Sequence, residues 1–189
     1  MRALDYPFAI PDRSFVHHRG EVREPGEVEV DRSDRVALLA YGSNAAPEVL
    51  DRKLAADPDP VLMMRATLLG YDVVYSNHLS AYGAVPATLH GSPGTEATVF
   101  VAYLSAAQLE LIALTEPNYD LTRLEDIRCE LEDGGRLSEI DAYVSRHGCL
   151  LDSDGSPVAL AAIPARARRL PVRSQAQAQA LFIAAFSGS

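Results

Sequence analysis

Apolar residues along the chain gather into short runs that polar, glycine-rich and proline-rich segments separate. Val36–Ala40 is a continuously apolar run with the length of a buried strand. Residues 61–76 also have strand composition, and Gly70 predicts a bend within them. Glu96–Leu104 is rich in valine, phenylalanine and tyrosine, which favour strands. The pattern therefore predicts a strand over each of these three segments.

Shorter apolar segments predict further strands, and glycine turns separate several of them. These strands are expected over residues 87–90, 126–132, 136–144, 147–151 and 158–163, with turns at 91–94, 134–135 and 155. Their hairpin-like spacing argues against a doubly wound parallel sheet.

Helix signals predict three helices, over about residues 44–54, 105–116 and 174–185. Asn44 is a favourable N-cap for the first helix, which tolerates Pro47 in its first turn. Ser105–Gln108 and Ser174–Gln177 have the spacing of capping boxes, in which each side chain satisfies a backbone N–H of the other residue. Pro117 ends the second helix.

The predicted elements are mostly strands, together with three helices. This content is typical of an α+β domain with a curved or barrel-like sheet. Residues 1–34 contain several prolines, glycines and acidic residues, so we expect an N-terminal extended or irregular arm laid on the domain. Residues 35–189 then form the domain itself, and 189 residues is the length of a single domain with a sizeable core.

Net charge and hydropathy exclude some classes of binding partner and indicate where the protein is located. The formal net charge of −9 argues against nonspecific nucleic-acid binding, which requires lysines and arginines to neutralise phosphates. Four arginines, which we expect on a solvated strand edge or loop, form the only basic cluster: Arg166, Arg168, Arg169 and Arg173. No apolar run reaches the ~18 residues of a membrane span, and the N-terminus lacks the apolar stretch of a signal peptide, so the cytoplasm is the expected location.

Cysteines and histidines give little sign of a metal site. Cys129 and Cys149 lie in apolar, strand-like surroundings, where a free cysteine behaves as a small hydrophobe. The five histidines have no ligand spacing, and no metal is expected.

Glu116 is placed unusually for an acidic residue. It shares one predicted helix face with Leu109, Ile112 and Ala113. It also falls in the last turn of that helix, where the helix dipole disfavours an anion by ~0.3–1 kcal/mol. Both effects penalise the charged form and predict a raised pKa, suited to proton transfer near neutral pH. The alternatives are a solvated glutamate at a helix end and a glutamate paired with Arg123.

The stretch Tyr41, Gly42, Ser43 and Asn44 connects the first strand to the first helix. A helix N-terminus offers unpaired N–H groups that bind carboxylate or phosphate, and Gly42 allows a ligand close to the backbone. The stretch is neither a phosphate-binding P-loop nor a dinucleotide fingerprint, and Ser43 lacks the GxSxG setting of a nucleophile. The alternative is an ordinary structural turn.

These motifs, in this order, resemble those of the gamma-glutamylcyclotransferase-like family. That family opens its core with a strand ending in tyrosine-glycine-serine-asparagine, as at 41–44 here. A small-residue segment, a strand and a helix then deliver a glutamate, and residues 81–119 follow that order with Glu116 at the position of the catalytic acid/base. A later strand with Tyr143 is also similar. The resemblance covers roughly residues 36–165, and the arm lies outside it.

The resemblance implies a small mixed β-barrel-like sheet with flanking helices. It also implies a cyclotransferase that converts a γ-glutamyl amine or peptide to 5-oxoproline and a free amine, with a small-molecule substrate and no metal or organic cofactor. Glu116 is then the general acid/base, and the 41–44 loop holds the substrate. Tyr41, Tyr119 and Tyr143 are expected to line the pocket. The alternatives are a non-catalytic binding or regulatory protein with the same pocket, and an amide hydrolase.

Overall fold

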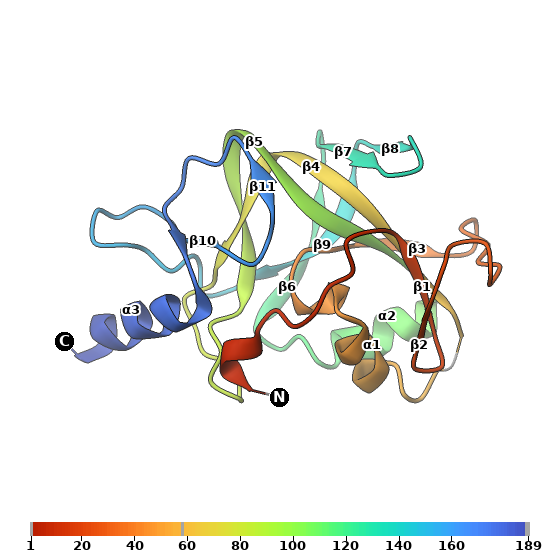
Figure 1. Ribbon diagram of the computed structural model, residues 1–189, viewed down its shortest axis with the longest axis horizontal. Coiled ribbons are helices and arrows are strands. Elements are labelled where there is room, and N and C mark those ends of the chain that lie inside the picture. The colour runs from red at the N-terminus through yellow and green to blue at the C-terminus, as the bar shows by residue number, and fades with distance from the viewer. Residues whose placement is uncertain (1, 58, 188–189) are drawn as a thin grey trace.

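A long, bent β-hairpin forms the centre of the molecule. The computed structural model describes residues 2–57 and 59–187. Strands β4 (Val61–Tyr75) and β5 (Ala87–Leu104) pair antiparallel along nearly their whole length (Figure 1). Their register shifts beside Gly70, whose φ of 79° lies in the left-handed region that favours glycine. The bend predicted at Gly70 is therefore confirmed.

The remaining strands extend this hairpin into one mixed sheet. The order along its main path is β12-β10-β4-β5-β3-β9-β6, and β1 and β7 pair with β4 while β11 pairs with β5. Two of the neighbouring pairs, β3–β9 and β10–β12, are parallel. The bounds are β3 Val36–Ala40, β6 Tyr119–Leu124, β7 Arg128–Leu131, β8 Arg136–Leu137, β9 Ile140–Ser145, β10 Ala159–Leu160, β11 Ala165–Arg166 and β12 Val172–Arg173.

The sheet curls but stays open. An isolated bridge between Ser76 and Cys149 brings the end of β4 beside the segment that follows β9. This curvature, without closure into a barrel, agrees with the predicted α+β class and with the mixed sheet. The predominance of antiparallel pairs also agrees with the argument against a doubly wound sheet.

The N-terminal segment is more regular than predicted. It contains the short 3₁₀ helix η1 (Ala3–Asp5) and a hairpin of β1 (Phe15–His18) and β2 (Glu21–Arg23). Strand β1 pairs with the start of β4, and Phe15 is buried. The hairpin was missed because its two strands are very short, and β1 gains stability from β4, which lies far along the chain.

The three predicted helices are present, and both capping boxes are confirmed. These helices are α1 (Pro47–Lys53), α2 (Ala106–Ala113) and α3 (Gln175–Ser187). Ser105 and Gln108 exchange side-chain-to-backbone hydrogen bonds of 3.0 and 3.1 Å, and Ser174 and Gln177 do the same at the start of α3.

The predicted N-cap at Asn44 is wrong. A 3₁₀ turn, η2 (Ser43–Ala45), precedes α1, and Ala46 takes the N-cap position without a side-chain hydrogen bond. Pro47 does stand in the first turn of α1. The side chain of Asn44 is left to make other contacts.

Several predicted strand limits in the second half are also wrong. Residues 91–94 are not a chain reversal, because β5 is continuous and Glu96 pairs with both Leu69 and Tyr71 across a bulge. Residues 136–144 divide into β8 and β9, and 147–151 contribute only isolated bridges. Strand β6 was missed because half of its residues are polar or charged and it lies at the sheet's edge.

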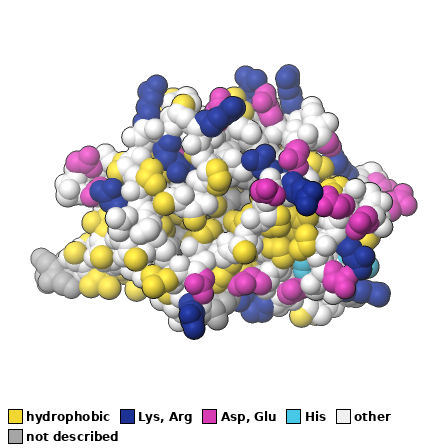
Figure 2. Space-filling view, viewed as in Figure 1, with side chains coloured by type: hydrophobic (Ala, Val, Ile, Leu, Met, Phe, Trp, Pro, Cys, Tyr) yellow, Lys and Arg dark blue, Asp and Glu magenta, His cyan; other side chains and the backbone are white. Residues whose placement is uncertain are grey.

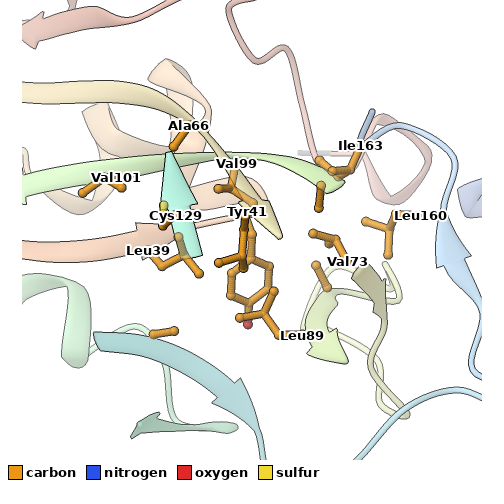
Figure 3. Close-up of a cluster of buried hydrophobic side chains, with 14 of the residues drawn as sticks. Leu39, Tyr41, Ala66, Val73, Leu89, Val99, Val101, Cys129, Leu160 and Ile163 are labelled. Carbon is orange, nitrogen blue, oxygen red and sulfur yellow. The ribbon is translucent and has the colours of Figure 1, made fainter. Parts of the chain in front are cut away.

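Two hydrophobic clusters cover the two faces of the sheet. Leu39 belongs to the larger cluster with α3, part of which Figure 3 shows, and Leu38 belongs to the cluster beneath α1 and α2. Successive side chains of a strand point to opposite faces, so a strand buried on both sides is continuously apolar. This explains the uninterrupted run that ends in Ala40.

One member of the arginine cluster, Arg168, is largely removed from solvent, which corrects the prediction of a solvated edge. Arg168 donates to both carboxylate oxygens of Asp72 at 2.8–3.0 Å, and the side chains are 11% and 0% exposed. Arg168 also donates to the backbone carbonyls of Leu160 and Ile163. Arg166, by contrast, is exposed and pairs with Glu96. No local pattern near either residue indicates that Asp72 faces Arg168.

Charges of both signs share the surface, and the two cysteines lie in at least partly buried positions, as their apolar surroundings predict. Figure 2 shows acidic and basic side chains interspersed on one face, around apolar patches. Cys129 is buried in β7, and burial raises the pKa of its thiol to about 11. Cys149 is half-buried, and burial raises its thiol pKa as well. No described helix is long and apolar enough to cross a membrane.

The buried ion pair predicts a large difference between two neighbouring arginines. We expect Arg168→Ala to lower the free energy of unfolding by ~3–5 kcal/mol, because it leaves the Asp72 charge buried without a partner. Arg166→Ala is the matched control and should cost ~1 kcal/mol or less, because its pair with Glu96 is exposed. Urea unfolding measures both. Equal losses would contradict this account.

Candidate functional site

Two chain segments meet at one end of β3. The 41–44 loop follows the last residue of β3, whereas α2 follows β5 and begins at the opposite end of β3, where Leu104 pairs with Val36. The eight residues of α2 run back ~12 Å along the five-residue strand. The turn after α2 thereby carries Glu116 to the loop.

Glu116 lies beyond the helix and not in its last turn. Helix α2 ends at Ala113, and the Glu116 N–H donates to the Ala113 carbonyl at 3.2 Å in the turn that follows. Ala113 is exposed, so the predicted shared face with Glu116 is wrong there, although Ile112 is buried. The helix-dipole argument for Glu116 therefore does not apply.

Three polar side chains form the centre of the site. Asn44 Nδ2 donates to Glu116 Oε1 at 2.9 Å. Lys53 Nζ donates to the same oxygen at 2.6 Å and to Asn44 Oδ1 at 2.8 Å. The side chains of Lys53 and Glu116 are only 9% and 11% exposed, so water screens this ion pair weakly.

Lys53 was missed by the sequence analysis, which offered Arg123 as the partner of Glu116. Arg123 instead pairs with Glu139 and Asp141 at the exposed edge of the sheet. The available signal was that Lys53 is the only lysine in the chain and ends the helix that follows the 41–44 loop.

The surroundings of Lys53 have two opposing effects on its pKa. Burial lowers the pKa of Lys53 below the ordinary lysine value, and the Glu116 carboxylate opposes that shift.

Both donors to Glu116 reach Oε1, and within the described residues no hydrogen bond reaches Oε2. One oxygen therefore orients the carboxylate while the other is available to a ligand.

A cavity of about 480 Å³ opens in front of this carboxylate, a volume typical of small-molecule sites. Lys53 and Glu116 line one side of it. The connection between β4 and β5 forms another wall through His78, residues 80–82 and Pro86. A smaller recess of about 40 Å³ shares Ser43 and Glu116 with the cavity and reaches Tyr41, Gly42 and Asn44.

The predicted tyrosines surround the smaller recess. Tyr41 donates its hydroxyl proton to the Tyr143 carbonyl, and Tyr119 donates to the Ala87 carbonyl at 2.9 Å. Burial raises the pKa of all three phenols, so they stay protonated. The structure thus brings every residue proposed from the sequence to one place, while their roles with a ligand stay predictions.

The space beside Gly42, where a ligand was expected, is occupied by a side chain of the protein. A Cβ at Gly42 would lie 2.8 Å from Tyr6 Oη and 3.1 Å from the Ala87 Cβ. Its φ of −138° needs no glycine. The missing side chain therefore makes room for Tyr6, a residue of the N-terminal arm that the sequence analysis did not connect with the site.

One histidine, His78, contributes to the wall of the cavity. His78 Nδ1 lies 2.7 Å from Ser76 Oγ, and its ring stacks on His147 at 4.6 Å between centroids. Burial, together with His147, lowers the pKa of His78 to about 4, so it is neutral near pH 7. Within residues 2–57 and 59–187, no three His, Cys, Asp or Glu side chains form a group that could hold a metal ion.

Comparison with known proteins identifies the fold. No protein-family model matches the chain, and no curated protein matches its sequence. A solved structure described as gamma-glutamyl cyclotransferase matches with a TM-score of 0.50 and 17% identity, over 60% of this chain and 68% of its own. An uncharacterized human protein matches with a TM-score of 0.48 and 19% identity, over 61% of this chain and 69% of its own. A protein from Arabidopsis thaliana matches with a TM-score of 0.47 and 19% identity, over 65% and 74%.

The first of these likenesses shows that the chain has the gamma-glutamyl cyclotransferase fold. The fold expected from the family resemblance is thereby confirmed.

The ion pair predicts how the single lysine titrates. In protein labelled with [¹³C]lysine, the Lys53 Cε signal should report a pKa below the ordinary lysine value, because burial disfavours the ammonium. In Glu116→Gln that pKa should fall further, because the opposing carboxylate is gone. Glu110→Gln, an exposed change on α2, is the control and should leave the titration as in the wild type. A Lys53 pKa unaffected by Glu116→Gln would refute the coupling.

Proposed function

We propose that this chain is a cyclotransferase that converts a γ-glutamyl amine or peptide to 5-oxoproline and a free amine. The observation that carries the proposal is the Glu116 carboxylate, oriented by Asn44 and Lys53, facing the 41–44 loop at a cavity of small-molecule size. The shared fold with gamma-glutamyl cyclotransferase supports the same reaction class.

The reaction is an intramolecular aminolysis in which Glu116 moves one proton. The lone pair of the substrate's α-amine attacks its own γ-carbonyl carbon, and the carbonyl electrons move onto oxygen. Glu116 takes the proton that the attacking nitrogen loses, through the oxygen that Asn44 and Lys53 leave available. When the bond to the leaving nitrogen breaks, Glu116 returns the proton to that nitrogen and the carbonyl reforms.

Lys53 and Asn44 are positioning residues in this scheme. The Lys53 ammonium pairs with the Glu116 carboxylate at 2.6 Å and holds it in place. Both side chains fix one carboxylate oxygen, so the other keeps its direction toward the cavity. Such fixed geometry matters because a misplacement of about 1 Å can cost 10²-fold in rate.

The 41–44 loop and the tyrosines hold the substrate. Backbone N–H groups of the loop bind the α-carboxylate or the developing oxyanion, and Tyr119 and Tyr143 enclose the folded γ-glutamyl chain in the recess. Ring closure requires the substrate chain to fold on itself, which a small recess favours. No step requires a metal or an organic cofactor.

A binding or regulatory protein with the same pocket is the second candidate, and the ion pair is the observation that favours it. A carboxylate held in a nearly buried ion pair with an ammonium also suits recognition of a substrate-like ligand without turnover. This candidate differs from the first in a measurable way, because it binds γ-glutamyl compounds and leaves them intact.

Incubation with a panel of substrates separates the candidates. Gamma-glutamyl dipeptides, glutathione and γ-glutamylamines are each incubated with the protein, and the products are separated by chromatography. Release of 5-oxoproline is the result expected for a cyclotransferase. Free glutamate would indicate an amide hydrolase, and calorimetric binding without any product would indicate the second candidate.

Replacement of the acid/base tests the mechanism directly. Glu116→Gln should keep the fold and lower 5-oxoproline release by at least ~10²–10⁴-fold, the usual contribution of a general acid–base group. Glu110→Gln is the surface control and should turn over like the wild type. Unchanged turnover by Glu116→Gln, with circular dichroism showing an intact fold, would remove Glu116 from the mechanism.

A further inference from the structure

The N-terminal arm places a tyrosine against the candidate site. Tyr6 lies in a turn that the Phe8 N–H closes by donating to the Asp5 carbonyl at 2.6 Å. Its ring packs edge-on against Phe8, which in turn contacts Tyr82 of the cavity wall. Tyr6 is 6% exposed and lines both the cavity and the smaller recess.

Tyr6 and Gly42 fit each other closely. Any side chain at position 42 would meet the Tyr6 hydroxyl, since even a Cβ would lie 2.8 Å from it. Real Cβ atoms essentially never come this close to another atom, so the hydroxyl keeps this place only because residue 42 is glycine. The N-terminal arm therefore packs directly against the 41–44 loop through Tyr6.

The hydrogen bonds of Tyr6 differ from those of its neighbours. Its hydroxyl oxygen accepts from the Ala87 N–H at 2.7 Å. Tyr41 and Tyr119 instead donate their protons to backbone carbonyls. Across the part of the chain that the structure describes, the Tyr6 hydroxyl has no acceptor for its own proton. Burial also raises the pKa of Tyr6, so the phenol keeps that proton.

We propose that the Tyr6 hydroxyl donates a hydrogen bond to the γ-carbonyl oxygen of the substrate and stabilises the oxyanion that forms when the α-amine attacks. This inference rests on the proposed cyclotransferase function and adds a catalytic residue to it. The proton stays on Tyr6 throughout. The attacking nitrogen still delivers its proton to Glu116, and the leaving nitrogen still receives it from there.

The Ala87 N–H makes Tyr6 a better donor. A backbone amide that donates to the phenol oxygen polarises its O–H bond, and hydrogen bonds in such a chain strengthen one another. Because Tyr6 is buried and held from two sides, by Gly42 and by the Ala87 amide, it needs little rearrangement during the reaction. A donor aligned in advance with the developing charge is a major source of rate acceleration.

The test is the steady-state kinetics of Tyr6→Phe on the γ-glutamyl substrate that the wild type turns over fastest. We expect kcat to fall by ~10²–10³-fold, the usual loss for one oxyanion donor, with KM changed less than about threefold. Tyr71→Phe, a half-buried tyrosine of β4 outside the site, is the matched control and should keep wild-type kcat. Circular dichroism and urea unfolding check that each variant is folded.

Gly42→Ala is a second variant that leaves the Tyr6 hydroxyl in the protein but displaces it. It should lower kcat to a similar extent, and the double variant with Tyr6→Phe should lose little more, because both changes remove one interaction. This variant keeps the inference testable if Tyr6→Phe does not fold.

The remaining outcomes overturn the inference. Wild-type kcat in a folded Tyr6→Phe, or an effect confined to KM, would show that the hydroxyl does not stabilise the transition state. A higher kcat would show that the arm obstructs the site. In each of these cases the wild type still releases 5-oxoproline. A wild type that releases none from any γ-glutamyl compound refutes the proposed function itself, and the role of Tyr6 with it.

Discussion

The ion pair between Lys53 and Glu116 ties together the parts of the candidate site. Lys53 comes from the end of α1, Glu116 from the turn after α2, and Asn44 bridges them from the loop after β3. Asn44 and Lys53 lie on the segment that follows β3, whereas Glu116 lies on the segment that follows β5, and neither helix is long. A desolvated pair with a third hydrogen-bonding partner is strong only if all three side chains are in place, so it couples the position of the carboxylate to the packing of both helices.

Much of the architecture could be predicted from local patterns. The buried strand Val36–Ala40 was found because a strand covered on both faces is continuously apolar, and two helix starts were found because capping boxes act within four residues. The meeting of Glu116 with the 41–44 loop was inferred through a family resemblance. Helix spacing alone placed Glu116 on the wrong element.

The features that could not be predicted all depend on distant partners. The burial of Arg168 requires Asp72, nearly a hundred residues away, and nothing near either residue signals the other. Asn44 resembled a helix cap because caps and network members use the same side chains. Tyr6 had no local signal, since its position depends on the absence of a side chain at Gly42. Contacts between residues this far apart in the chain leave no trace in hydrophobic periodicity or in motif spacing.

The connection between β4 and β5 has an evolutionary consequence. Residues 76–86 lie between two strands that are paired along their length, and they supply part of the cavity lining. Loops of this kind accept insertions and exchanges that leave the elements they join undisturbed. Descendants of this chain can therefore diverge in the ligand they accept by altering one hairpin connection, while the arrangement of Asn44, Lys53 and Glu116 is inherited unchanged.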